Sequence, residues 1–228
     1  MNEFDPLDPG SAAAAVPGSS RDDDPARPFP WPPAEDESVI SAFGRTWQGA
    51  SLRPRAFFAS MPERASLGAA VMYYLSIGIA AAGAMLFFEM VREPPATDPD
   101  SMLGQLFMRS TMPLVDFLLS PLFLLLSLFV SAGVTHVMLK MLGAASRPYG
   151  FTVRTFAFAY SPQILGIIPY AGTVAGFSWM VYVAIAGLSA GQRTTTARAA
   201  VAVLVPLALA VAFVAVAMLM ATTIMTVS

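Results

Sequence analysis

Two ionisable side chains, Asp116 and His136, are the candidates for proton chemistry in the apolar part of the chain. An acid or a histidine inside a membrane can pass a proton or handle a solute, and such groups are costly enough there to be functional by default. Twenty residues separate the two, which places them about 30 Å apart along one helix and on nearly opposite faces. They therefore cannot form a relay. We expect Asp116 at the membrane interface and His136 among the lipid headgroups.

The stretch GFSW at 176–179 loosely resembles the serine motif of intramembrane proteases. Ser178 would need His136 within about 3 Å to act as a nucleophile–base pair. We expect the serine in the outer half of one helix and the histidine at the inner end of another, well over roughly 10 Å apart. Metal chemistry lacks ligands too, because the chain has one histidine, no cysteine and no carboxylate after Asp116. Without a glycine-rich nucleotide loop either, the sequence predicts a protein that is not an enzyme and uses no cofactor.

The most polar patch within the apolar runs is YSPQ, which carries Tyr160, Ser161 and Gln163. Pro162 has no backbone donor and leaves a carbonyl free, which a serine or glutamine side chain could satisfy. This pattern indicates a bend in a membrane helix. The alternative is an intramembrane polar site for a ligand, to which Asp116 and His136 would also contribute.

Composition predicts that lipid surrounds the segments that carry these residues. Hydrophobic residues make up 56% of the 228 residues and charged residues only 12%, whereas ordinary soluble domains carry about 25% charged residues. Residues 1–38 hold nine acids and two arginines, and the rest of the chain holds eleven bases and six acids. We expect residues 1–37, which are acidic and rich in proline, to form a disordered cytoplasmic tail. The run PFPWPPAEDE at 28–37 is either a recognition motif anchored by Trp31 or a solvated linker.

Residues 38–64 place aromatic and basic side chains next to one another ahead of the first long apolar run. Apolar residues recur there at helical spacing, with Ser38 as a candidate cap and Pro54 at the start of a second helix. Basic residues beside aromatic rings are typical of helices that lie on a membrane surface. We therefore predict interfacial amphipathic helices rather than the core helix of a soluble domain. The expected membrane-surface anchors are Trp47, Arg53, Arg55, Phe57, Phe58 and Arg64.

Residues 65–228 are predicted to form an all-α integral membrane domain with five transmembrane helices. Four uncharged runs each exceed the roughly 20 residues that cross a bilayer, and the run from Thr155 to Gln192 is long enough for two crossings with a break at IPYAG, 168–172. The expected spans are about 66–90, 113–140, 154–169, 171–190 and 198–225.

The basic residues predict the orientation of these spans. With the amino terminus in the cytoplasm, nine arginines and lysines of the membrane-embedded part lie inside, and only Arg92 and Arg109 lie outside. The carboxyl terminus, Ser228, is then outside. A short surface helix is expected in the outer loop, residues 91–112.

Two small-xxx-small patterns permit close contact between helices. We expect their glycines to serve packing within one chain rather than dimerisation, and the oligomeric state stays open. These glycines are Gly172, Gly176, Gly187 and Gly191.

Three segments taken together resemble the Yip (Ypt-interacting protein) domain family: RPRAFFASMP, GFTVRTFAFAYSPQILGIIPYAG and GQRTTTARAAVAVLVP. The resemblance covers roughly residues 40–225 and implies a five-helix membrane protein with a cytoplasmic amino terminus. Eukaryotic members are associated with Rab-type GTPases and with vesicle and organelle membranes. This chain lacks a clear DLxGP-type stretch before the first span and is more similar to the prokaryotic branch, so GTPase binding is not expected. The resemblance implies no catalytic residues.

Two functions fit these observations. The favoured one is a non-enzymatic Yip-type integral membrane protein with a membrane-organising or adaptor role, exerted through its cytoplasmic tail and interfacial helices. The alternative is a small-solute or lipid transporter, or an accessory subunit of a transporter, although five spans are few and no inverted repeat is evident. The expected partners are membrane lipids and a protein that binds the tail, with no nucleic acid. The expected location is a prokaryotic cytoplasmic (inner) membrane.

Overall fold

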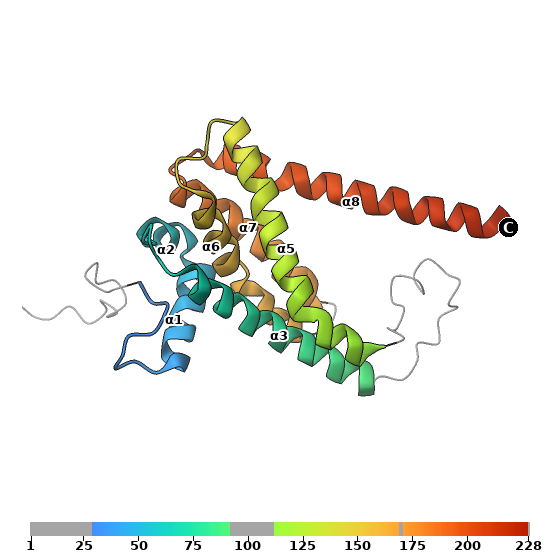
Figure 1. The fold of residues 1–228 in the computed structure, drawn as a ribbon, viewed down its shortest axis with the longest axis horizontal. Helices are drawn as coiled ribbons and strands as arrows, with labels where there is room; N and C mark the ends of the chain where they lie inside the picture. Colours follow the sequence, from blue (N-terminus) through green and yellow to red (C-terminus); the bar gives the residue numbers. More distant parts are fainter. Residues whose placement is uncertain (1–28, 92–111, 169–170, 228) are drawn as a thin grey trace, which may run out of the picture.

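The computed structural model describes residues 29–91, 112–168 and 171–227, and all regular elements in these ranges are helical (Figure 1). The expected surface helix in the outer loop falls within 92–111 and lies outside the described residues, as do Pro169 and Tyr170 of the IPYAG break. The elements are α1 (Val39–Leu52), α2 (Pro54–Ser60), α3 (Leu67–Val91), α5 (Pro113–Met141), α6 (Tyr149–Ala159), the 3₁₀ helix η2 (Ser161–Ile167), α7 (Ala171–Gly191) and α8 (Thr196–Val227).

Four of the described helices, α3, α5, α7 and α8, are long and apolar enough to cross a membrane. Each carries at most two charged residues in its most apolar stretch, because charged side chains in a bilayer are costly. Within a membrane a helix also satisfies its own backbone hydrogen bonds. The chain is therefore an all-helical, multi-pass membrane protein.

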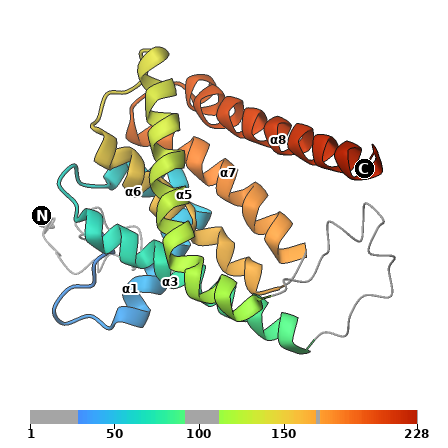
Figure 2. The same cartoon turned by 45° about the vertical axis from the view of Figure 1, so that its right-hand side comes forward.

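The helices have their ends at two opposite sides of the bundle. The carboxyl end of α3 and the amino end of α5 lie toward one side, and the carboxyl end of α8 points the same way (Figures 1 and 2). At the opposite side, here named the α1–α2 end, the short helices gather. Hydrogen bonds there join the α2–α3, α5–α6 and α7–α8 connections to neighbouring elements.

The segment predicted as the third span, 154–169, differs from a single helix. Helix α6 begins earlier, at Tyr149 after Pro148, and ends at Ala159, and the chain continues as the 3₁₀ helix η2. Pro162 cannot donate to the carbonyl of Phe158 four residues before it, which ends the α-helical ladder. The Ser161 hydroxyl donates to that carbonyl oxygen at 2.6 Å. The break is therefore satisfied locally, by serine rather than by glutamine.

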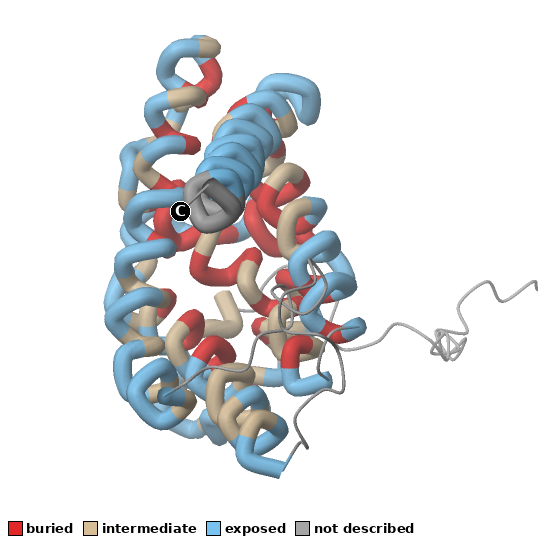
Figure 3. The backbone as a smooth tube through the Cα atoms, turned by 90° about the vertical axis from the view of Figure 1, so that its right-hand side faces the viewer, coloured by how far each residue is buried: buried red, intermediate tan, exposed pale blue. Residues whose placement is uncertain are grey.

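The main core lies between α2, α3, α6 and α7. Its largest enclosed side chains include Phe58, Tyr73, Phe151 and Phe158, all exposed by no more than 1%. A second, smaller core joins the first turns of α8 to the ends of α5 and α7. Figure 3 shows the buried residues inside the bundle, whereas α8 is exposed over most of its length. The outward-facing surface is thus apolar, as a lipid environment requires.

Residues 29–37, which the sequence assigned to a disordered tail, pack against the helices. The Trp31 indole N–H donates to the carbonyl oxygen of Ala69 on α3 at 2.7 Å, and its ring lies 5.4 Å from that of Tyr73. The Phe29 ring lies 4.8 Å from Phe57 and 5.6 Å from Phe158. Phe29 and Trp31 therefore anchor this segment to the helices. The prediction of a disordered tail is wrong for residues 29–37. Residues 1–28 lie outside the described residues.

Candidate functional site

Helices α1 and α2 contribute buried side chains to the protein core. Phe57 is 6% exposed and Phe58 is completely buried. A Cβ atom at Gly187 of α7 would lie only 2.6 Å from Phe58 Cδ2, so the missing side chain makes room for the ring. The structure corrects the expectation that Phe57 and Phe58 anchor the protein to the membrane surface: the amphipathic faces of these helices are covered by α6 and α7.

The other expected surface anchors divide between protein contacts and exposed positions. The Trp47 indole N–H donates to the Ser161 carbonyl oxygen at 3.0 Å, which ties α1 to η2. Arg53, Arg55 and Arg64 are exposed. Arg55 Nη2 donates to the Thr196 hydroxyl at 3.1 Å and so joins α2 to the first turn of α8. Only the arginines of this set therefore face outward.

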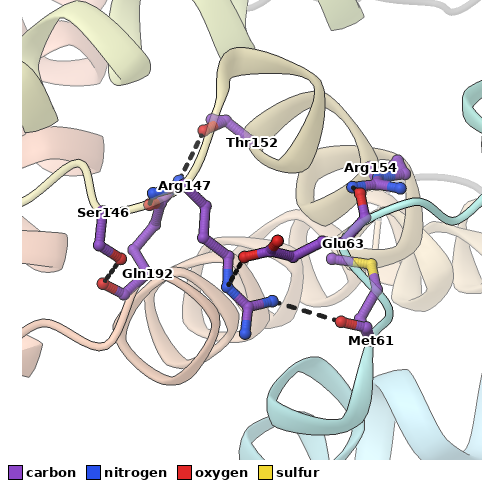
Figure 4. A network of polar contacts seen from close by, with 7 residues as sticks. All are labelled: Met61, Glu63, Ser146, Arg147, Thr152, Arg154 and Gln192. Carbon is purple, nitrogen blue, oxygen red and sulfur yellow. Dashed lines mark hydrogen bonds and ion pairs between the residues drawn. The ribbon is translucent and has the colours of Figure 1, made fainter.

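A buried arginine holds the α2–α3 connection (Figure 4). Arg154 on α6 is 3% exposed, and its guanidinium donates to the carbonyl oxygens of Glu63 and Ala65. These carbonyls have no helical partner, because α2 ends at Ser60 and α3 begins at Leu67. These bonds satisfy Nη1 and Nη2 of the buried guanidinium, whereas its buried Nε has no hydrogen-bond partner. Arg154 thereby fixes the connection between the amino-terminal helices and the first long helix.

A second arginine extends this network to the α5–α6 connection. Arg147 Nη1 donates to the Met61 carbonyl oxygen at 3.3 Å, and Arg147 Nε lies 3.8 Å from a Glu63 carboxylate oxygen. The guanidinium also lies 4.4 Å from the centre of the Phe151 ring, a cation–π distance. Glu63 is mostly exposed, with 68% of its side-chain surface accessible, so this ion pair contributes little.

Gln192, at the end of α7, completes what we call the inner junction (Figure 4). Its side-chain oxygen accepts from the Arg147 backbone N–H at 2.7 Å, and its side-chain nitrogen donates to the Thr152 hydroxyl at 3.1 Å. The Ser146 hydroxyl donates to the Gln192 carbonyl oxygen. The inner junction comprises Met61, Glu63, Ser146, Arg147, Thr152, Arg154 and Gln192.

His136 lies beside this junction and not among lipid headgroups. It is 6% exposed, and its Nδ1 is 2.9 Å from the Thr152 hydroxyl. Its ring also meets that of Tyr149 at 5.7 Å. The expectation of an outward-facing histidine is therefore wrong, because α6 packs across this part of α5 and covers the imidazole.

The YSPQ patch forms a second polar cluster, and its members bond to neighbouring helices. The Tyr73 hydroxyl lies 2.8 Å from the Ser161 hydroxyl. The Tyr160 ring packs 4.4 Å from that of Tyr74, whose hydroxyl donates to the Leu124 carbonyl oxygen at 3.1 Å. These contacts join α3, α5 and η2 around the helix break. They stabilise the break.

The structure does not bring Asp116 or His136 to the YSPQ patch. Tyr74, which packs on Tyr160 of the patch, hydrogen-bonds to Leu124 and Ser127 of α5. Asp116, which is exposed in the first turn of α5, is eleven residues from Ser127 and so about 16 Å along the helix. His136 lies about 13 Å from Ser127 in the other direction. Gln163 lies beside α7, where a Cβ atom at Gly176 would come within 2.8 Å of its side-chain oxygen.

All four candidate packing glycines face other parts of the same chain. Gly172 and Gly176 lie against η2, where added Cβ atoms would meet the carbonyl oxygens of Leu165 and Pro162. Gly187 and Gly191 lie against the rings of Phe58 and Phe151. The two patterns thus allow α7 to approach η2 at one end and α2 and α6 at the other.

The inner junction was not identified from the sequence. One signal was available: Arg154 immediately precedes the uncharged run of 38 residues from 155 to 192, and Gln192 is the last residue of that run. Chemically, the junction offers guanidinium, amide and hydroxyl donors. In the described ranges no three His, Cys, Asp or Glu side chains gather as a metal site would need. The arrangement can hold segments together and present a surface.

Comparison with known proteins gives one match. The family model described as the Yip1 domain matches residues 49–218, which run from the end of α1 into the carboxyl-terminal part of α8. The match contains the inner junction and the YSPQ patch. No curated protein and no solved structure matches the chain.

Proposed function

Because this chain belongs to the Yip1 domain family, we propose that it is a non-enzymatic membrane protein with a membrane-organising or adaptor role, which recruits partners through its cytoplasmic amino-terminal segments. The inner junction supports this role, since Arg147, Arg154 and Gln192 bond to backbone groups that connect the helices. The hydroxyl–histidine hydrogen bond between Thr152 and His136 is buried, and the Thr152 hydroxyl also accepts from the Gln192 side chain. The transporter alternative has less support, because Ser161 and Tyr160 of the YSPQ patch contact Tyr73 and Tyr74 of α3.

In this proposal the chain crosses the membrane five times, with the α1–α2 end in the cytoplasm. Four crossings are made by α3, α5, α7 and α8. The fifth crossing is made by α6 and η2 together and contains the helix break. Because successive crossings run in opposite directions, six basic residues then lie on the cytoplasmic side: Arg53, Arg55, Arg64, Lys140, Arg193 and Arg198. Basic residues are retained on the cytoplasmic side in membrane proteins generally. A prokaryotic cytoplasmic membrane is the proposed location.

The observation that carries the adaptor role is the docking of residues 29–37. Phe29 and Trp31 fix this segment to α2, α3 and α6. Glu37 pairs with Arg45 of α1. A partner that binds the acidic segment before Phe29 would therefore be held close to the membrane domain at one place. Fixing the attachment in advance lowers the entropic cost of bringing a partner to the membrane.

Affinity purification from native membranes in a mild detergent tests the adaptor role. Three forms are compared: the full chain, a chain starting at Phe29, and the full chain with Phe29→Ala and Trp31→Ala. We expect specific proteins with the full chain, their loss without residues 1–28, and their partial loss from the double variant. Recovery of the same proteins with and without residues 1–28 would contradict the proposal. Co-purification of a defined small solute with no protein partner would favour the transporter alternative.

A further inference from the structure

His136 lies at the end of a series of hydrogen bonds that joins the α5–α6 connection, the end of α7, α6 and α5. The Arg147 backbone N–H donates to Gln192 Oε1 at 2.7 Å. Because a backbone N–H can only donate, this bond fixes the orientation of the amide, and Gln192 Nε2 donates to the Thr152 hydroxyl at 3.1 Å. His136 Nδ1 lies 2.9 Å from the same hydroxyl. One threonine therefore connects the amide to the imidazole.

The directions of these bonds determine which form of the imidazole fits. The Thr152 oxygen accepts from Gln192, and its own proton is left to be donated. Among the hydrogen bonds of the described residues, His136 Nδ1 is the acceptor found for this proton. Nδ1 must then offer a lone pair, and the proton of the ring is on Nε2. The folded structure therefore selects the neutral imidazole.

Protonation of Nδ1 is incompatible with this set of bonds. A protonated imidazole donates from both nitrogens, so the Thr152 oxygen would accept from His136 and from Gln192, and its own proton would lose its acceptor. Thr152, Gln192 and His136 are 0%, 1% and 6% exposed, which separates them from solvent. A buried donor without a partner is costly. At least one bond between these three side chains must therefore break.

The charged groups of α5 and α6 do not compensate a positive imidazole. Lys140 lies one turn after His136 on α5, so the two cations would repel each other. Asp116 lies twenty residues before His136 on the same helix, about 30 Å away. On α6, Tyr149 contributes an aromatic ring at 5.7 Å, and Arg154 donates to carbonyl groups of the α2–α3 connection.

The acids of the other described elements are engaged or distant. The Glu63 carboxylate lies 3.8 Å from Arg147 Nε, and Figure 4 shows this guanidinium pointing toward the α2–α3 connection. Helix α3 carries Glu89 near its carboxyl end, at the opposite side of the bundle (Figure 1). The α7–α8 connection and α8 add Arg193 and Arg198 and no acid. A proton on the imidazole would therefore add charge to a basic region.

We propose that His136, Thr152 and Gln192 form a proton-sensitive contact at the inner junction. The neutral imidazole holds the end of α7 to α5 and α6. Protonation turns the Thr152 hydroxyl, frees the Gln192 side chain and so loosens the α5–α6 connection, whose Arg147 N–H that side chain binds. The hydrogen-bond reversal does not depend on the orientation of the chain, which decides only on which side of the membrane acidification acts.

The pH dependence of stability can be assigned to one group, because His136 is the only histidine of the chain and ordinary carboxylates titrate near pH 4. Reversible unfolding of the full chain is measured in mixed detergent micelles at about pH 7.5 and about pH 5.5. The unfolded chain takes up a proton near pH 6.5, whereas the folded chain holds the neutral ring. Stability is therefore lost as the pH falls, and we expect the unfolding constant to rise about tenfold.

Three variants separate the hydrogen-bond reversal from other causes. His136→Asn keeps an acceptor for the Thr152 hydroxyl but does not titrate, and its unfolding constant should be the same at both pH values. Gln192→Glu replaces the amide donor by an acceptor, so that Thr152 can donate to it and accept from a protonated His136, and the rise should disappear or reverse. Lys140→Gln removes the neighbouring charge and should keep the rise.

Hydrogen exchange read by mass spectrometry follows the predicted release. At about pH 5.5, residues 142–148 of the α5–α6 connection should exchange faster in the unaltered chain than in His136→Asn at the same pH. Equal exchange in the two proteins would overturn the proposal. So would a tenfold rise in Gln192→Glu, because burial of the histidine alone would then explain the pH dependence. Loss of the rise in Lys140→Gln would assign it to the lysine charge and would also overturn the proposal.

Discussion

Gly187 allows α2 to lie directly on α7, and this contact decides where the amino-terminal helices sit. We predict that Gly187→Ala destabilises the protein by about 1–3 kcal/mol, because the added methyl group would overlap the enclosed Phe58 ring. The midpoint of thermal unfolding in detergent measures this effect. Gly44→Ala on α1 is the matched control, since nothing lies within 4 Å of the added atom. A Gly187→Ala protein as stable as this control would show that Phe58 does not fill the space beside Gly187.

Arg154 supplies the donors for two carbonyl groups that no helix satisfies. We predict that Arg154→Met, which keeps much of the side-chain volume, lowers the free energy of unfolding by about 2–3 kcal/mol by leaving the Glu63 and Ala65 carbonyls unpaired. Arg64→Met removes an exposed arginine from the same connection and should leave stability unchanged. Comparing the two by chemical unfolding tests the role of the inner junction. A smaller effect at Arg154 than at Arg64 contradicts it.

Residue types alone singled out Phe57, Phe58 and His136 as candidates, but did not show what surrounds these side chains, which are buried. A buried ring on an amphipathic helix can be covered by lipid or by protein, and the two are similarly apolar. The deciding feature is a glycine more than 120 residues away, Gly187, which no local pattern connects to Phe58.

At the scale of elements, residues at the break between α6 and η2 hold several helices together. We predict that Ser161→Ala costs about 2–3 kcal/mol, since it leaves the Phe158 carbonyl and the Tyr73 hydroxyl without the hydrogen bonds that Ser161 makes. Ser178→Ala is the matched control, because that hydroxyl is exposed and bonds only to the Val174 carbonyl oxygen of its own helix. Thermal unfolding of both variants in detergent should separate them. Equal midpoints would mean that Ser161 does not stabilise the break.

Helix positions were the most predictable feature of the fold. The expected spans 66–90, 113–140 and 171–190 lie within a residue or two of α3, α5 and α7, because uncharged runs and flanking prolines mark where helices begin and end. The third segment was harder. Pro162 predicted a bend, but the pattern gave no sign that the chain would continue as a 3₁₀ helix or that α6 would start at Tyr149.

At the scale of the whole molecule, composition was enough to predict a multi-pass helical membrane protein. The docking of residues 29–37 could not be predicted from the sequence, because their composition is that of a solvated segment. Their partners, Phe57, Tyr73 and Phe158, come together only when α2, α3 and α6 have packed. Residues 29–37 therefore pack onto the membrane domain that they were expected merely to precede.

The proposal depends most on five crossings with the α1–α2 end in the cytoplasm, and the absence of cysteine makes this directly measurable. Single-cysteine variants Glu35→Cys, Thr195→Cys and Ser228→Cys would be labelled with a membrane-impermeant maleimide in sealed vesicles of known sidedness. We predict labelling of Glu35→Cys and Thr195→Cys from the cytoplasmic face only, and of Ser228→Cys from the opposite face only. If α6 and η2 do not cross, Thr195→Cys and Ser228→Cys exchange faces, and that result would contradict the account.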